Sequence, residues 1–203
     1  MVIEVFADIV CPFTHVGLRR VVERRRELGA GSVLHVRAWP LELVNGEPLA
    51  AGLVAEEVQA LREQVAPDLF TGFDRSRFPA TSLPAMTLAD VAYRQSASLG
   101  EQVSLAIRDA LFEQGRDIST AAVLADIAGT YGLGLPEAVD RATILADWED
   151  GKRRGVEGSP YFFVGGSTFF CPALEITRVG EHLQITTDQA GLEGFLAQAF
   201  PAG

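Results

Sequence analysis

A cysteine followed directly by a proline, near the start of the chain, is the feature of this sequence best suited to chemistry. The segment reads Cys11-Pro12-Phe13-Thr14-His15. A cysteine acts as a nucleophile through its thiolate, which can attack a disulfide and form a mixed disulfide. The other cysteine, Cys171, stands far away in the sequence. The sequence therefore predicts chemistry at a single thiol, that of Cys11.

The residues on both sides of Cys11 predict the elements that position it. Residues 2–8 alternate and are rich in β-branched and aromatic residues, which is typical of a strand. After the cysteine, apolar residues recur at helical spacing: Leu18, Val21, Val22 and Leu28. Pro12 suits the first turn of that helix. A thiol at a helix N-terminus faces unpaired N–H groups and the positive end of the helix dipole, so we expect a lowered pKa and a thiolate at Cys11.

Three neighbours of Cys11 are candidates for tuning its thiol. His15 follows Cys11 by one helical turn, so both side chains can share one helix face, where an imidazolium would favour the thiolate. The alternative is that His15 packs within the protein. The Thr14 hydroxyl can hydrogen-bond the sulfur, although capping or contact with solvent is an equal alternative. Phe13 and Thr14 are expected to tune the thiol and to line the rim of the site around it.

The composition limits the class of protein. The chain has 203 residues, of which 48% are hydrophobic, enough for one globular domain or for one domain with a large insertion. The formal net charge of -10 argues against nucleic acid and anionic membranes as partners, because no basic stripe offsets phosphate repulsion. The single basic run, Arg24-Arg25-Arg26, is flanked by glutamates and is typical of a solvated helix face.

The start of the chain and its cysteine content bear on location and metal binding. Met1 leads directly into the predicted strand, without the basic region and cleavage site of a signal peptide. No apolar run approaches the length that spans a membrane, so we expect a cytoplasmic protein. Two cysteines are too few for a disulfide framework, and no histidine is spaced for a metal site, so no metal is expected.

The two ends of the chain predict an α/β frame. The first strand and helix are followed by a strand at residues 32–39, a βαβ unit whose strands should be parallel. Residues 161–164 and 167–170 predict two antiparallel strands joined by a tight turn at Gly165-Gly166. The remaining predicted elements of this frame are a hairpin at 175–186 and a closing helix at 191–200.

The middle of the chain predicts helices and no strand. A loop at residues 41–52 leads into them, and prolines and Gly72 break an irregular stretch at 67–84. The helices are expected at residues 55–65, 85–95, around 103–111, at 120–132 and from Pro136 towards Arg154. We therefore predict a frame in two parts, residues 1–52 and 155–203, that carries an all-α insertion at 53–154.

This order of motifs resembles the DsbA family of thioredoxin-fold proteins, and in particular its FrnE-like cytoplasmic branch. Two segments carry the resemblance: residues 8–17 around the Cys-Pro pair, and residues 155–164, in which Gly-Ser-Pro precedes a strand. The resemblance covers essentially the whole chain. It implies a thioredoxin-like α/β fold with an inserted helical subdomain, and it implies that Cys11 is an attacking thiol.

The same resemblance assigns residues to a substrate groove. It implies that Pro160 is cis and packs opposite Cys11, and that Ser159 offers backbone groups to an extended substrate. Pro12 and Phe13 would lie beside this groove. An X–Pro bond is the peptide bond for which the cis form costs little. Without the resemblance, a trans Pro160 that opens an edge strand would be favoured.

Thr14 stands where the redox members of the family carry their second cysteine, which excludes a vicinal-dithiol mechanism at this motif. In a first hypothesis, Cys11 works as a monothiol, and a small thiol such as glutathione or mycothiol completes the exchange. In a second, Cys171 resolves the mixed disulfide, which needs Cα atoms within about 7 Å of each other. The alternative for Cys171, a buried small hydrophobe, is favoured over this role.

A third hypothesis belongs to another class of enzyme. The chain also resembles kappa-class glutathione transferases and hydroxychromene-carboxylate isomerases, which carry Ser-Pro-x-Ser at this site and use a hydroxyl to activate glutathione without a redox step. Thr14 matches that pattern and Cys11 does not. A site that only binds is the fourth alternative. We predict a thiol-disulfide oxidoreductase that acts on a small thiol or a protein disulfide, without a required cofactor, as a monomer or homodimer.

Overall fold

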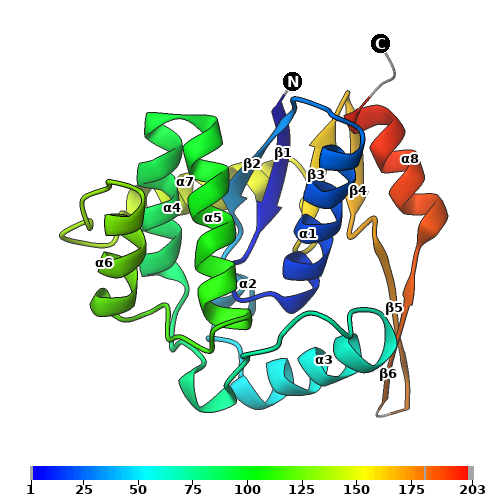
Figure 1. Cartoon of the computed structure of the whole chain (residues 1–203), viewed down its shortest axis with the longest axis horizontal. Helices are drawn as coiled ribbons and strands as arrows, with labels where there is room; N and C mark the ends of the chain where they lie inside the picture. The colour runs from blue at the N-terminus through cyan, green and yellow to red at the C-terminus, as the bar shows by residue number, and fades with distance from the viewer. Residues whose placement is uncertain (1, 181, 201–203) are drawn as a thin grey trace.

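The computed structural model of the chain describes residues 2–180 and 182–200 and is built around a four-stranded sheet. The strands of this sheet are β1 (Val2–Ala7), β2 (Val33–Ala38), β3 (Tyr161–Val164) and β4 (Ser167–Phe170). They lie in the order β2-β1-β3-β4 (Figure 1). β1 and β2 are parallel, as the βαβ pattern predicts, and β3 pairs antiparallel with both β1 and β4.

Helices flank the sheet and fill the long connection from β2 to β3 (Figure 1). They are α1 (Pro12–Glu27), α2 (Leu41–Asn45), α3 (Ala51–Gln64), the 3-10 helix η1 (Arg75–Arg77), α4 (Leu83–Gln95), α5 (Ala97–Phe112), α6 (Ala121–Thr130), α7 (Arg141–Arg153) and α8 (Gln189–Ala199). A separate antiparallel hairpin consists of β5 (Leu174–Val179) and β6 (His182–Thr187).

Alternate residues of β1 point to opposite faces of the sheet and define its two layers. Ile3 and Val5 pack against apolar residues of α1 and α8, which cover one face. Phe6 packs on the other face with Trp39 and with Trp148 of α7. The alternation read from the sequence is therefore what places helices on both sides of the sheet.

The hairpin of β3 and β4 brings distant parts of the chain to one edge of the sheet. Gly165 and Gly166 join the two strands with φ values of 56° and 85°, a left-handed conformation that glycine adopts without steric cost. Tyr161 then pairs with Phe170 on one side and with Phe6 on the other. The end of β4 therefore returns to the edge where β1 ends and α1 begins.

Two predicted boundaries are wrong because aspartate side chains accept hydrogen bonds from the N–H groups at the starts of two helices. The expected loop at 41–52 contains α2 and the start of α3, and the Asp8 carboxylate accepts a hydrogen bond from the Leu41 N–H at 2.6 Å at the start of α2. The helix expected from Pro136 begins at Arg141, because the Asp140 side chain accepts a hydrogen bond from the Thr143 N–H at 3.1 Å and caps α7 there.

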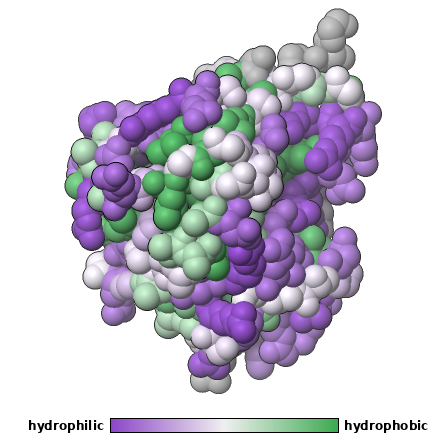
Figure 2. Space-filling model, turned by 60° about the vertical axis from the view of Figure 1, so that its left-hand side comes forward, coloured by the Kyte–Doolittle hydropathy of each residue, from purple (hydrophilic) through white to green (hydrophobic). Residues whose placement is uncertain are grey.

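The inserted helices share a core with the start of α1. Apolar side chains of α3, α4, α5 and α6 pack together, and Val10 and Val16 belong to the same cluster. On the side of the molecule that carries the inserted helices, apolar residues form a patch bordered by hydrophilic ones (Figure 2). Among the described residues, no helix combines the length and apolar character needed to cross a membrane.

Candidate functional site

Cys11 lies at the junction of β1 and α1, where the sequence predicts it. It is the N-cap residue of α1, and the His15 N–H donates a helical hydrogen bond to its carbonyl at 3.2 Å. Pro12 follows in the first turn and is buried, while Phe13 is half-buried against the core of the inserted helices. Cys11 itself is 4% exposed, so its thiol is enclosed by protein.

The thiol of Cys11 contacts the segment that precedes β3. Its Sγ–H donates a hydrogen bond to the carbonyl oxygen of Ser159, with 3.2 Å between sulfur and oxygen, across 148 positions of sequence. The Ser159–Pro160 peptide bond is cis, as the resemblance implies. A Cβ atom added at Gly17 would lie 3.7 Å from the ring of Pro160, so α1 packs directly against this proline.

The side chain of Ser159 links the cysteine motif to β1. Its Oγ accepts a hydrogen bond from the Asp8 N–H at 2.8 Å and forms a second one with Thr14 Oγ1, also at 2.8 Å. Thr14 is fully buried, and Ser159 is nearly so. The structure therefore brings together four of the predicted site residues: Cys11, Thr14, Ser159 and Pro160.

Burial changes the protonation expected for Cys11. It raises the pKa of the thiol above its ordinary value. Hydrogen bonds from the Thr14 side chain and backbone act to lower this pKa, and the negative charge of Glu57 acts to raise it further. The expected lowering of the pKa is therefore wrong, because the helix N-terminus is enclosed rather than open to solvent. A protonated thiol also fits the hydrogen bond that Sγ donates to Ser159.

The His15 side chain pairs with Glu113 and packs among aromatic rings. Its Nε2 lies 2.7 Å from Oε1 of Glu113, and its ring contacts Phe70 and Phe112. Burial lowers the pKa of His15, and the hydrogen bond to Glu113 opposes this only in part. Burial acts to raise the pKa of Glu113, but hydrogen bonds from His15 and two backbone N–H groups lower it to about 2. His15 is thus a neutral packing residue, which is the second of the two alternatives given for it, and it does not act as an imidazolium on Cys11.

Sequence reasoning missed a buried cation beneath the site. Arg108 of α5 is fully buried and donates hydrogen bonds to the Asp8 carbonyl at 3.1 Å and to the Ser104 hydroxyl at 2.8 Å. Burial lowers the pKa of Arg108 to about 10, although the charges of Tyr93, Asp8 and Cys11 act to raise it. It therefore stays charged at neutral pH. The signal in the sequence was a charged residue directly after Ile107, on the apolar side of a predicted helix.

Cys171 reaches the same edge of the sheet. It directly follows β4, is 4% exposed, and donates a hydrogen bond from its N–H to the Pro160 carbonyl at 3.0 Å. Both cysteines are free thiols. The return of β4 that the sequence predicts therefore places Cys171 beside the cis proline that Cys11 faces.

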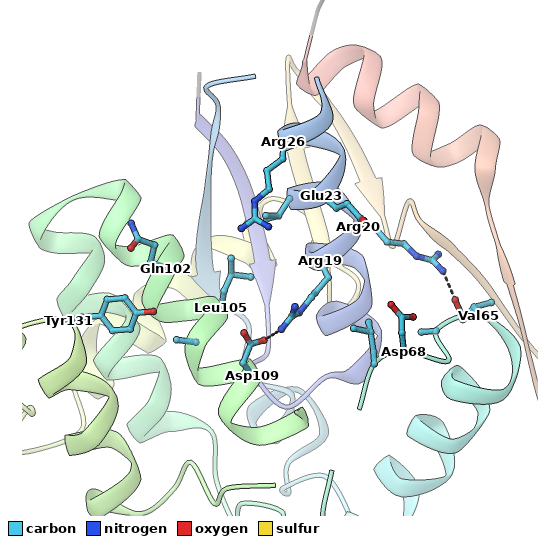
Figure 3. Close-up of a pocket in the computed structure, with 14 residues that line it drawn as sticks. Arg19, Arg20, Glu23, Arg26, Val65, Asp68, Gln102, Leu105, Asp109 and Tyr131 are labelled. Carbon is cyan, nitrogen blue, oxygen red and sulfur yellow. Dashed lines mark hydrogen bonds and ion pairs between the residues drawn. The ribbon is translucent and has the colours of Figure 1, made fainter. Parts of the chain in front are cut away.

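A separate cavity of about 490 Å³ lies between α1, α5 and the segment that follows α3 (Figure 3). Arg19 and Asp109 form an ion pair at this cavity, and Arg20 donates a hydrogen bond to the Val65 carbonyl at 2.9 Å. Its lining includes none of the predicted site residues. The cavity is therefore distinct from the thiol site.

Comparison with known proteins decides the family. The family described as DSBA-like thioredoxin domain matches residues 2–184. The chain belongs to this family. A search of curated proteins found no match.

Solved structures agree with this DSBA-like protein in fold. A probable DsbA oxidoreductase from Streptomyces coelicolor has 16% identity and a TM-score of 0.65, over 100% of this chain and 91% of that one. The cytosolic disulfide reductase DsbM from Pseudomonas aeruginosa has 20% identity and a TM-score of 0.60, over 97% of this chain and 98% of that one. A 2-hydroxychromene-2-carboxylate isomerase has 13% identity and a TM-score of 0.61, over 84% of this chain and 88% of that one. The thioredoxin-like α/β fold with inserted helices is confirmed, as are the resemblances to the DsbA family and to the isomerases.

Proposed function

We propose that this DSBA-like protein catalyses thiol-disulfide exchange through Cys11, with a small thiol as its second partner. One observation carries the proposal: the Cys11 thiol, at the start of α1, hydrogen-bonds the carbonyl of Ser159 directly before the cis Pro160. A disulfide substrate that lies in extended form along Ser159 would meet the sulfur there. The similar structure of DsbM adds support, because that protein is a cytosolic disulfide reductase and was also solved with GSH. The same likeness favours a cytoplasmic location.

The exchange begins when the Cys11 thiol loses its proton. Hydrogen bonds from Thr14 favour the thiolate against the effect of burial, and the positive end of α1 acts in the same direction. The thiolate attacks one sulfur of the substrate disulfide, a new S–S bond to Cys11 forms, and the old S–S bond breaks. The departing sulfur leaves as a thiolate and takes up a proton. A small thiol, glutathione or mycothiol, attacks the mixed disulfide in turn and releases Cys11 as a thiol.

Intact-mass measurement after incubation with oxidised glutathione tests this proposal. In a Cys171→Ser protein, Cys11 is the single remaining thiol, so we expect the mass of one glutathione to be added. The Cys11→Ser, Cys171→Ser double variant is the matched control and should gain no mass. If the folded Cys171→Ser protein stays unmodified at neutral pH while the same protein reacts once unfolded, Cys11 does not perform exchange.

A glutathione-transferase-like or isomerase-like activity is the second candidate. The Thr14 hydroxyl lies inside the site, hydrogen-bonded to Ser159, at the motif position where those enzymes carry a serine. The fold of the similar isomerase supports this alternative. It predicts that conjugation of glutathione to an electrophile survives Cys11→Ser and is lost in Thr14→Val. Loss of the activity in Cys11→Ser alone would exclude it.

A further inference from the structure

The second cysteine of the chain stands across from the cis proline. Tyr161 and Phe170 are the last paired residues of β3 and β4, so the next residues outward, Pro160 and Cys171, lie opposite each other. The Cys171 N–H donates a hydrogen bond to the Pro160 carbonyl at 3.0 Å, which holds its backbone at this place.

Cys11 approaches the same peptide from α1. Its Sγ donates a hydrogen bond to the Ser159 carbonyl, so the two cysteines contact consecutive carbonyl groups, those of Ser159 and Pro160. A negative charge on Cys11 acts to raise the pKa of Cys171. Both are free and equally enclosed. The thiol site therefore contains two cysteines and not one.

The backbone at Cys171 has an unusual conformation. Its φ is 43°, and among the described residues the only other non-glycine residue with positive φ is Phe70. The left-handed backbone conformation is unfavourable for residues with a Cβ atom. Non-glycine residues that nevertheless adopt it gather at functional sites. The Leu174 N–H donates a hydrogen bond to the Cys171 carbonyl at 3.1 Å and closes a turn around it.

We propose that Cys171 is the resolving thiol of this site: once Cys11 holds a mixed disulfide, Cys171 attacks the Cys11 sulfur and closes a Cys11–Cys171 disulfide. The inference rests on the proposed exchange at Cys11: Cys171 takes the place of the small thiol in resolving the mixed disulfide, and two small thiols reduce the Cys11–Cys171 disulfide in a later exchange. With oxidised glutathione, the first glutathione leaves when the mixed disulfide forms, and the second leaves when Cys171 displaces it. The two protein thiols lose two electrons and two protons, and one glutathione disulfide becomes two glutathione thiols.

The electrostatics suit this order of events. Burial and the nearby Cys11 charge raise the pKa of Cys171 to about 12, while Arg20 and the Leu174 N–H act to lower it. A Cys11 in a mixed disulfide carries no charge, so its influence on Cys171 disappears at the step in which Cys171 must lose its proton. The Arg20 guanidinium remains beside Cys171, because it donates hydrogen bonds to the carbonyls of Ala173 and Val65 at 3.1 and 2.9 Å.

A time course of intact mass with oxidised glutathione tests the inference. The natural protein should show a transient adduct of one glutathione, followed by a product without glutathione that lacks two hydrogens. Cys171→Ser and Cys171→Ala should stop at the adduct. Proteolysis of the natural protein without reductant should release one cross-linked peptide pair containing Cys11 and Cys171, a readout that does not depend on the folding of any variant.

The outcomes separate this inference from the proposed function. An adduct that is equally stable in the natural protein and in both Cys171 variants, with no cross-linked peptides, overturns the resolving role and leaves exchange at Cys11 standing. No adduct and no cross-link in any of the folded proteins overturns exchange at Cys11 and the inference with it. A cross-link that forms in the natural protein and is absent when Cys11→Ser is tested supports both.

Discussion

Replacing Ser159 by alanine should destabilise the protein by roughly 2–6 kcal/mol. The Ser159 hydroxyl has two partners, the Asp8 N–H and the Thr14 hydroxyl, each 2.8 Å away. Asp8 and Thr14 are fully buried, so no solvent takes the place of the lost hydroxyl. Each buried polar group left without a partner costs about 1–3 kcal/mol, and two such groups add to the range given.

A double-mutant cycle with Thr14→Val separates the two hydrogen bonds. Thr14→Val alone should cost about 1 kcal/mol, because Ser159 keeps its bond with Asp8. When both residues are changed, the Asp8 N–H is the single member of this network left unpaired. The loss in the double variant should therefore fall short of the sum of the two single losses by about 2–4 kcal/mol.

Urea unfolding followed by circular dichroism measures the free energy of unfolding of each variant. Ser98→Ala is the matched control, because Ser98 lies exposed on α5 and should change stability by less than about 0.5 kcal/mol. Losses that add to within about 0.5 kcal/mol would show that Ser159 and Thr14 do not share this hydrogen bond. A Ser159→Ala loss as small as that of the control would refute the reasoning that this hydroxyl holds the cis proline segment against the cysteine motif.

Three further predictions concern the surroundings of the site. Arg108→Met should slow alkylation of Cys11 by iodoacetamide at pH 7 about tenfold, since it removes a buried positive charge that acts on the thiolate, and an unchanged rate would contradict this. Glu113→Gln should cost about 2–3 kcal/mol at pH 7. The pKa of Glu113 is about 2 in the folded protein and higher in the unfolded chain. In urea unfolding, the difference in free energy of unfolding between the natural protein and the variant should therefore persist above about pH 4.3 and vanish as pH falls towards 2. Gly151→Ala should cost about 1–3 kcal/mol in the same assay, because its Cβ would lie 2.6 Å from the Trp39 ring, whereas Gly129→Ala, with open space around it, should not destabilise.

Local patterns were enough to predict the frame of the fold. The alternation in β1, the Cys-Pro pair at a helix start and the turn at Gly165-Gly166 each act over a few neighbouring residues, so periodicity and turn chemistry reveal them. Helix boundaries were less predictable: α7 begins at a local cap, Asp140, that the pattern after Pro136 did not single out, and α2 begins at a carboxylate whose position depends on the folded chain. Asp8, which caps α2 at Leu41, lies 33 positions away in sequence.

The sequence by itself determined that Cys11 lies at the start of a helix, and the resemblance to the DsbA family implied that Pro160 faces it. The tertiary structure decided the protonation of the Cys11 thiol, because the pKa of a thiol depends on whether solvent or protein surrounds it. A helix N-terminus presents the same dipole in either case, but here the start of α1 is enclosed by the segment that holds Ser159 and by the inserted helices. The turn at Gly165-Gly166 predicts that Cys171 returns to Pro160, but the pairing of β3 with β1, which brings both residues to Cys11, joins distant segments and is not contained in local sequence patterns.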